Sequence, residues 1–307
     1  MKNMPNKFKR WHKISLTVVL LLLAGTWYLF VYDPPYSGPI TKSAQTLVFA
    51  HRGGGFYAPD NSMMGAEASM AEGFNGVDMD AQLTKDGQIV IFHDLSVDRL
   101  TASTGRVSDK TAAEMLALDV APKFKPGMTG AYVDTFDDFV KNISPKGILM
   151  VELKVTGLQN TGIEQKAADI IKKYNAYDHV YLSSFNPFVL WRLKHINPQI
   201  HTVLIFMDTD WNAQLIAEIK PSDYVDLPWF LRNEYIRTAI RKIIKPDLLS
   251  VNIAVATSTI DKLQKNGWPI FLWTPETAPD ITAALARHPY GVISDEPQLT
   301  RTLEHAQ

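Results

Sequence analysis

The chain of 307 residues contains no cysteine. Without thiols it cannot form a disulfide framework, a zinc–thiolate site, an iron–sulfur cluster or a cysteine nucleophile. It also lacks an excess of either charge, because Lys and Arg total 31 and Asp and Glu total 32. The missing basic excess argues against a nucleic-acid-binding protein. Hydrophobic residues make up 46% and charged residues 21%, which is typical of a folded globular chain and excludes disorder as the main state.

The N-terminal segment contains no acidic residue before Asp33. Residues 1–13 form a basic tail, and residues 14–32 carry no charge. At about 1.5 Å per residue the uncharged run would extend about 28 Å, close to the roughly 30 Å hydrocarbon core of a bilayer. Aromatic residues favour the membrane interface, and Trp27, Tyr28 and Tyr32 lie at the outer end of the run. The run therefore predicts a transmembrane anchor.

The basic tail predicts that the N-terminus stays in the cytoplasm. The protein would then be a single-pass protein of the inner (cytoplasmic) membrane, with its catalytic domain on the periplasmic or extracellular side. A cleaved signal peptide is the alternative. Its cleavage site would have to use Ala24-Gly25-Thr26, the only cluster of small residues, although the apolar run continues beyond it. Residues 33–45, which begin with Asp33-Pro34-Pro35, are expected to form a linker.

Beyond the linker, short apolar and β-branched runs recur and alternate with helical patterns. The runs predict strands at Thr46–Ala50, Gly76–Ala81, Ile89–His93, Ile148–Leu153, His179–Ser183, His201–Ile205, Leu248–Val251, Ile270–Trp273 and Gly291–Ser294. Helical spacing of apolar residues predicts helices at Ser62–Gly73, Ile163–Tyr174, Ile260–Asn266 and Asp280–Arg287, and a basic helical pattern covers Arg232 to Lys245. This alternation is typical of an α/β protein with a parallel sheet.

The number of strand–helix units over residues 46–307 predicts a TIM (β/α)₈ barrel. A doubly wound open sheet is the alternative, but no glycine-rich phosphate-binding fingerprint follows a strand. Two stretches interrupt the alternation. Residues 95–145 are expected to form a small insertion after the second strand, and residues 207–247 include the apolar segment Leu227–Leu231.

Charged and polar residues collect at the predicted carboxyl ends of the strands, which form the active face of a barrel. The candidates are His51, Arg52, Asp78, Asp80, His93, Glu152, Lys154 and Trp273. Two residues apart on one strand, Asp78 and Asp80 point to the same face. Three carboxylates without cysteine favour a hard divalent cation, Mg²⁺ or Ca²⁺, over zinc. Because Arg52 and Lys154 suit a phosphate group, a phosphate ester is the expected substrate.

The motifs together resemble the glycerophosphodiester phosphodiesterase family, in its membrane-anchored bacterial form. They are His51-Arg52-Gly53-Gly54, Pro59-Asp60-Asn61-Ser62, Gly76-Val77-Asp78-Met79-Asp80, Leu83-Thr84-Lys85-Asp86-Gly87, His93-Asp94, Asp98-Arg99-Leu100-Thr101, Glu152-Leu153-Lys154, Ser183-Ser184-Phe185, Trp273-Thr274 and Ser294-Asp295-Glu296-Pro297. The resemblance covers roughly residues 46–304.

The resemblance implies hydrolysis of glycerophosphodiesters to sn-glycerol 3-phosphate and an alcohol. In this sequence His51 and His93 would be the acid and the base, and Arg52 and Lys154 would bind the phosphate, with Asp60 and Trp273 as further substrate-binding residues. A divalent cation would be held by Asp78, Asp80 and Glu152.

Four residues depart from the family pattern. Aspartate stands at Asp60 and Asp78 where the family usually has glutamate, and Pro275-Glu276 replaces the usual Val-Asn. Each aspartate is one methylene shorter, which makes the affinity and identity of the metal the property most affected. Two further functions stay open: a lysophospholipase D acting on membrane lysolipids, and a membrane-tethered binding protein with weak catalysis.

Overall fold

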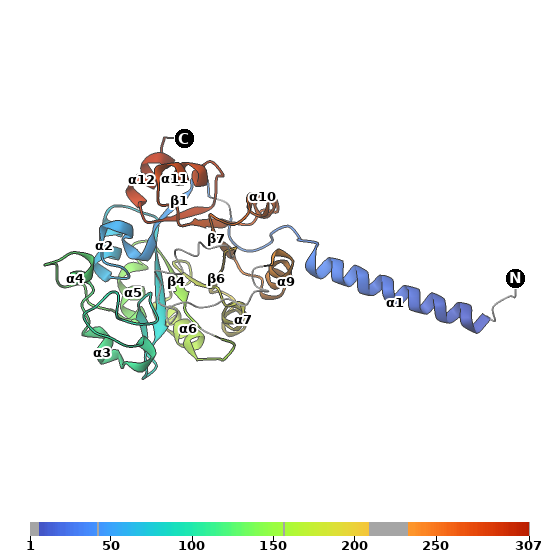
Figure 1. Ribbon diagram of the computed structural model, residues 1–307, viewed down its shortest axis with the longest axis horizontal. Helices are drawn as coiled ribbons and strands as arrows, with labels where there is room; N and C mark the ends of the chain where they lie inside the picture. The colour runs from blue at the N-terminus through green and yellow to red at the C-terminus, as the bar shows by residue number, and fades with distance from the viewer. Residues whose placement is uncertain (1–5, 42, 156, 209–232, 307) are drawn as a thin grey trace.

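The computed structural model describes residues 6–41, 43–155, 157–208 and 233–306, with side chains from residue 16 onward. The predicted apolar segment Leu227–Leu231 lies outside the described residues. Helix α1 (Asn6–Phe30) projects away from the body of the molecule (Figure 1). Within the side chains that the structure describes, no helix is both long enough and apolar enough to cross a bilayer.

Eight parallel strands form the body of the molecule. They are β1 (Leu47–Ala50), β2 (Gly76–Leu83), β4 (Ile148–Leu153), β5 (Val180–Ser184), β6 (His201–Phe206), β7 (Leu248–Asn252), β8 (Ile270–Trp273) and β9 (Gly291–Ser294). The strand order is β1-β9-β8-β7-β6-β5-β4-β2, and β1 also pairs with β2. This last pairing closes the sheet, so the predicted TIM barrel is confirmed and the open doubly wound sheet is excluded.

The predicted strand at Ile89–His93 is not a barrel strand, which corrects the expectation. The shorter strand β3 (Ile89–Ile91) pairs antiparallel with β2, with Leu83 opposite Ile89. The turn Thr84–Gln88 reverses the chain because Gly87 adopts φ 77°, a conformation that glycine takes without strain. The backbone N–H of Phe92 then donates to the carbonyl of Asp80. The hairpin thus returns His93 to the level of the carboxylates on β2.

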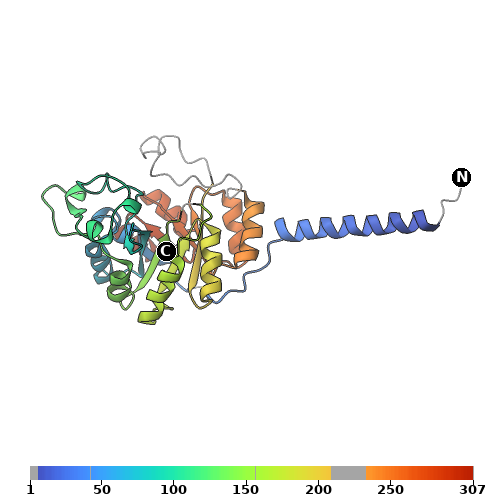
Figure 2. The same cartoon turned by 90° about the horizontal axis from the view of Figure 1, so that it is seen from below.

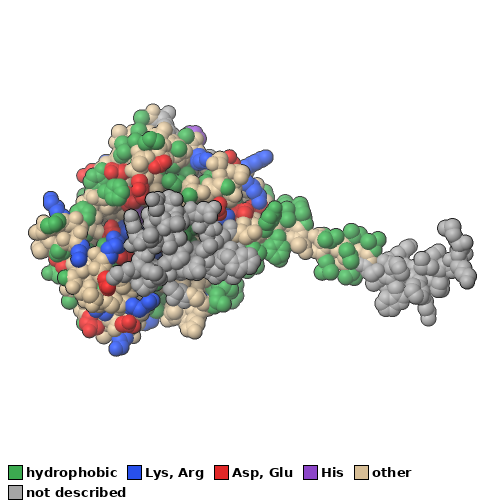
Figure 3. Space-filling model, in the orientation of Figure 1, with side chains coloured by type: hydrophobic (Ala, Val, Ile, Leu, Met, Phe, Trp, Pro, Cys, Tyr) green, Lys and Arg blue, Asp and Glu red, His purple; other side chains and the backbone are tan. Residues whose placement is uncertain are grey.

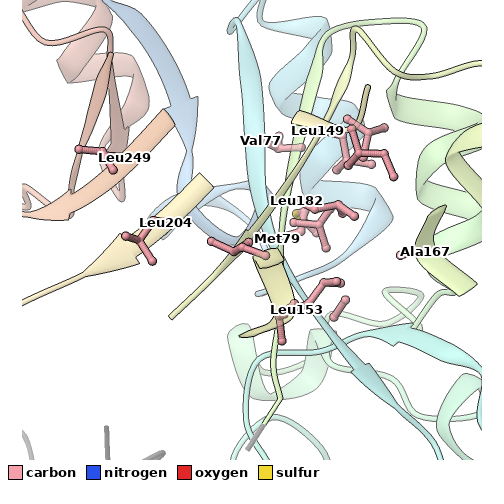
Figure 4. Close-up of a cluster of buried hydrophobic side chains, with 14 of the residues drawn as sticks. Val77, Met79, Leu149, Leu153, Ala167, Leu182, Leu204 and Leu249 are labelled. Atoms are coloured by element: carbon pink, nitrogen blue, oxygen red, sulfur yellow. The ribbon is translucent and has the colours of Figure 1, made fainter. Parts of the chain in front are cut away.

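Helices surround the barrel. They are α2 (Met63–Ala71), α5 (Phe136–Ile143), α6 (Ile163–Tyr174), α7 (Pro187–Ile196), α9 (Glu234–Ile244), α10 (Thr257–Lys265), α11 (Ala278–Leu285) and α12 (Pro297–Glu304). Alternate residues of the strands point out toward these helices. Val77, Met79, Leu149, Leu153 and Leu182 are fully buried there, in the cluster shown in Figure 4. This apolar layer holds the barrel and the helices together.

The inward-pointing residues divide the barrel interior into two parts. At the amino-terminal end an apolar layer fills the barrel, formed by Phe49, Met150, Tyr181, Val203, Leu248, Phe271 and Ile293. Above it the inward positions are polar, since Asp80 on β2 lies beside Glu152 on β4. Filled at one end and polar at the other, the barrel presents its chemistry only at the carboxyl ends of the strands.

A small subdomain lies between β3 and α5. It contains η3 (Val107–Asp109), α3 (Ala112–Leu116) and α4 (Ala121–Phe124), and it packs around its own buried cluster, formed by Val90, Phe92, Val97, Leu100, Val107, Met115, Val120, Ala121, Ala131 and Val133. Helix α5 contacts α2, α6 and β4, as a barrel helix does. The subdomain is joined to the barrel directly after His93, so its packing fixes the position of that histidine.

Candidate active site

His51 and Arg52 lie in a tight turn, η1 (His51–Gly53), directly after β1. Arg52 has φ 49°, a left-handed conformation that costs a non-glycine residue free energy and is typical of functional sites. His51 Nδ1 lies 2.7 Å from Asp295 Oδ1, at the end of the neighbouring strand β9. Because the carboxylate binds Nδ1, the Nε2 side of the His51 ring is left to face a substrate.

His93 is held between a carboxylate and a cation. Its Nδ1 lies 2.6 Å from Asp94 Oδ1, and its Nε2 lies 3.0 Å from Arg52 Nη2. The guanidinium can only donate, so Nε2 is the acceptor and carries no proton. Burial, together with the positive charges of Arg52 and Lys154, lowers the pKa of His93 to about 4. His93 is therefore neutral at pH 7.

Three residues that the sequence reasoning did not assign to the site position His93. Arg99 donates from Nε to Asp94 Oδ2 (2.7 Å) and from Nη2 to Asp94 Oδ1 (2.9 Å). Gln82 Nε2 donates to the backbone carbonyls of Phe92, His93 and Asp94. The motif Asp98-Arg99-Leu100 was a signal for Arg99, and the His93-Asp94 pair was a signal for Asp94. Nothing in the local pattern pointed to Gln82.

Two of the three predicted carboxylates contact one ammonium group. Lys154 Nζ lies 3.0 Å from Asp80 Oδ1 and 3.0 Å from Glu152 Oε2. Asp78 precedes Asp80 by two residues on β2, so its side chain points to the same interior, closer to the amino-terminal end of the barrel. Its pKa is raised well above the usual range by burial and by the nearby charges of Asp80 and Glu152. Burial also raises the pKa of Glu152, whereas Lys154, His93 and Arg52 outweigh burial at Asp80 and lower its pKa.

These carboxylates do not form a ready-made cation site. Among the residues that the structure describes, no three or more His, Asp or Glu side chains are arranged to hold a metal ion. The ammonium group of Lys154 takes the space between two of the predicted ligands. The donor chemistry nevertheless suits a hard cation, because three carboxylates lie in the barrel interior and Lys154 pairs with only two of them.

The other predicted residues take different places. Asp60 Oδ2 accepts from Arg52 Nη1 at 2.9 Å and orients the guanidinium. The carboxylate of Asp60 also offsets the cost of burying the positive charge of Arg52. Its neighbour Asn61 was not assigned to the site, yet its side chain binds both the backbone N–H and the carboxylate of Asp80. Trp273 ends β8 with its ring 5.9 Å from Phe185. Its indole Nε1 has no partner among the described residues, which leaves it available to a ligand.

Two histidines supported by carboxylates lie beside cations and acids, an arrangement suited to acid–base chemistry on an anionic ester. Comparison with known proteins identifies the class of ester. Residues 51–299 match the Glycerophosphoryl diester phosphodiesterase family. The chain belongs to this family and is a phosphoric diester hydrolase.

One relative, named glycerophosphodiester phosphodiesterase, comes from Caldanaerobacter subterraneus subsp. tengcongensis. It is 30% identical over 258 residues, which cover 83% of this chain and 96% of the relative. A crystal structure of a glycerophosphodiester phosphodiesterase from Agrobacterium tumefaciens superposes with a TM-score of 0.64 at 19% identity, over 84% of this chain and 99% of that one.

An Oleispira antarctica phosphodiesterase, solved in complex with the product sn-glycerol-3-phosphate, superposes with a TM-score of 0.66. It is 21% identical and is covered to 96%, against 84% of this chain. At these identities the two structural likenesses show the fold.

Proposed function

We propose that this protein hydrolyses glycerophosphodiesters to sn-glycerol 3-phosphate and an alcohol, with His51 and His93 as the acid–base pair. The observation that carries the proposal is the paired support of the histidines: each has a carboxylate on Nδ1, from Asp295 and Asp94 respectively. Such support fixes the tautomer of each ring, so that neither Nε2 carries a proton. The Nε2 of His93 accepts from Arg52 in this structure and would take a proton when Arg52 turns to the phosphate. Arg52 connects the two histidines, because it is the next residue after His51 and its guanidinium donates to His93 Nε2.

The buried cations have a clear task in this reaction. Arg52 and Lys154 would bind the phosphate oxygens and stabilise the charge that develops on them. One histidine would take the proton of the attacking hydroxyl, and the other would protonate the departing alkoxide. Asp60 would keep Arg52 aligned, and Trp273 would contact the substrate from the end of β8.

A divalent cation, Mg²⁺ or Ca²⁺, is part of the proposal. Asp78, Asp80 and Glu152 would hold it, and it would polarise a phosphate oxygen. The charge balance supports this, since the pKa values of Asp78 and Glu152 are raised by burial without a nearby cation that offsets it fully. Lys154, which pairs with Asp80 and Glu152 in this structure, would bind the phosphate when these carboxylates hold a cation.

The test is the turnover of glycerophosphocholine by the purified full chain. We expect excess chelator to abolish the release of sn-glycerol 3-phosphate and Mg²⁺ or Ca²⁺ to restore it. Glu152→Gln should lose activity and weaken cation binding in calorimetry, whereas Glu67→Gln, at an exposed ion pair with Lys146, should change neither. His51→Ala and His93→Ala should each lose about 10²–10⁴-fold in turnover. Full activity in chelator would contradict the metal, and unchanged activity of both histidine variants would contradict the mechanism.

Lysophospholipase D activity is a second candidate. A small apolar cleft lined by Phe185, Leu204, Phe206 and Ile240 lies beside the carboxyl ends of β5 and β6, where it would contact the first carbons of an acyl chain. Comparing the rate on glycerophosphocholine with the rate on lysophosphatidylcholine micelles decides between the two substrates. Absence of turnover on both, with retained binding, would favour the weakly catalytic binding protein.

We also infer that α1 anchors the enzyme in the inner membrane, with the basic tail in the cytoplasm and the barrel outside it. The uncharged run of residues 14–32 supports this, and the described side chains of α1 from Leu16 to Leu23 are exposed. The protein should remain with membranes after extraction in high salt and should keep its N-terminal residues. A soluble mature chain beginning near Thr26 would contradict the anchor.

A further inference from the structure

Helix α1 is fixed to the barrel by a buried junction. Asp33 Oδ2 lies 2.7 Å from Arg241 Nη2 of α9, and both side chains are almost fully buried. Lys242 Nζ donates to the carbonyl oxygens of Tyr28 and Leu29 at the end of α1. Charged groups buried in this way have few alternative arrangements. The junction therefore holds α1 at a set angle to the barrel.

The segment after α1 is fixed as well. Asn266 Nδ2 donates to the carbonyl of Asp33 at 3.1 Å. The hydroxyl of Tyr36 donates to the carbonyl of Asp247 at 2.8 Å, and its ring packs against Trp268. The linker thus follows the surface of the barrel instead of forming a free tether.

Helix α1 leaves the barrel at its side, where it contacts α9. In Figure 2 α1 lies across the direction of the upright helices of the barrel, among them α7 and α9. Helices α9 and α10 are the barrel elements nearest the base of α1 (Figure 1). The outward surface of these two helices is here called the α9–α10 flank. It includes Tyr235, Lys242, Ile243 and Lys262.

The α9–α10 flank has the composition of a surface that contacts lipid head groups. On α9, Tyr235 is 60% and Ile243 is 61% exposed. Lys242 lies over the rings of Tyr28 and Tyr32, and Lys262 of α10 lies 3.7 Å from Asp33. Figure 3 shows hydrophobic side chains along the described part of α1 and basic side chains over α10. Interfacial aromatic rings and lysines beside an apolar helix are typical of the anionic surface of a bilayer.

We propose that the α9–α10 flank is a membrane-facing surface that lies on the anionic head groups of the bilayer holding α1. The proposal rests on the anchor inferred above. Two observations select a bilayer as the partner: α9 contacts the exposed apolar helix α1, and Lys242 and Lys262 lie at the base of that helix. With the flank on the membrane, the barrel axis lies along the bilayer and the active face opens sideways into the water. Soluble diesters then reach the site freely, whereas lysolipids within the same bilayer do not.

The absence of cysteine from the chain permits a direct test. Single cysteines are introduced by Tyr235→Cys and Ile243→Cys and labelled with an environment-sensitive fluorophore. Phe124→Cys is the matched control, because Phe124 is also apolar and partly exposed but lies on α4, on the opposite side of the barrel from α1 (Figure 1). The full chain is reconstituted in vesicles of phosphatidylcholine and phosphatidylglycerol that carry a spin-labelled lipid as quencher.

The labels at 235 and 243 should lose most of their emission, and the label at 124 should keep it. Quenching should weaken when phosphatidylglycerol is omitted, because the exposed ammonium group of Lys262 then faces no anionic head group. Full emission at 235 and 243 in protein that resists salt extraction would overturn the flank while leaving the anchor. If high salt removes the chain from the vesicles and all three labels keep their emission, both the flank and the anchor are contradicted. Quenching equally strong at 124 would also overturn the flank.

Discussion

The two histidines of the site have similar partners on Nδ1 but different electrostatic surroundings. Asp295 supports His51, whereas the carboxylate of Asp94 that supports His93 is also bound by Arg99. Arg99 offsets the negative charge of Asp94, which leaves Asp94 less able to stabilise a protonated His93. The positive charge of Arg52 beside Nε2 also disfavours protonation of His93. These contacts favour the role of base for His93, because a base must be unprotonated when the substrate binds.

The pH dependence of catalysis follows from this environment. Burial and two cations lower the pKa of His93 to about 4. Protonation of His93 should therefore reduce the activity of the enzyme only near pH 4, not near the usual histidine pKa of about 6.5. The same shift predicts that stability falls as the pH is lowered from about 6.5 toward 4, because the unfolded state then binds the extra proton. The acid limb of kcat/KM and an NMR titration of His93 check this. An acid limb at pH 6.5 that is absent in His93→Ala would contradict it.

Arg99 should act as a positioning residue. Its two bonds to Asp94 hold the carboxylate against His93, so Arg99→Met should lower kcat by about 10–100-fold, as loss of an outer-shell partner typically does. Arg99→Lys keeps the charge and should recover part of the loss. Arg106→Met, an exposed residue of the same subdomain, is the control. A purely structural role would be indicated if Arg99→Met reduced stability while kcat of the folded fraction and its pH profile stayed unchanged.

At the scale of elements, the loop after β1 must pack directly against the end of β9. Gly55 has φ 57°, and a Cβ there would overlap the backbone carbonyl of Asp295, which also accepts from the N–H of Phe56. This close approach keeps His51 within reach of Asp295. A glycine is required because any side chain would separate the two segments.

Gly55→Ala should therefore reduce turnover as well as stability. The left-handed conformation alone costs about 1–2 kcal/mol for alanine, and displacement of Asp295 should add a loss of kcat. Gly127→Ala provides the control, since Gly127 has φ 82° but open space around its Cβ position. Turnover and thermal unfolding of both variants are measured. If Gly127→Ala lowers kcat as much as Gly55→Ala does, the contact with Asp295 is not responsible.

At the scale of the whole molecule, the buried ion pair of Asp33 and Arg241 helps to join the N-terminal helix to the barrel. Removing one partner of a buried pair leaves an unpaired charge, so Asp33→Ala should lower the free energy of unfolding by about 3–5 kcal/mol. Asp261→Ala, which breaks the exposed pair with Arg287, should cost at most about 1 kcal/mol. Denaturant unfolding of the full chain measures both. Equal effects of the two substitutions would show that the junction contributes little to stability.

Patterns that extend over a few residues could be recognised in the sequence. The strand at Ile148–Leu153 and the helix at Ile163–Tyr174 have the predicted bounds, because hydrophobic periodicity and local hydrogen bonding determine them. The barrel followed from the repetition of such units. The uncharged run 14–32 and the motif residues were equally visible, which allowed His51 and His93 to be chosen before any contact was known.

Only the tertiary structure decided which residues meet. Asp295 joins His51 from 244 positions along the chain, and Arg241 joins Asp33 from 208 positions. Lys154 occupies the space between Asp80 and Glu152 because β2 and β4 are neighbours in the closed barrel. A local pattern carries no information on such partners, since they are set by the order in which strands pair and the barrel closes. The antiparallel direction of β3 was decided in the same way, because a turn and a neighbouring strand, not the apolar run itself, fix the direction of a strand.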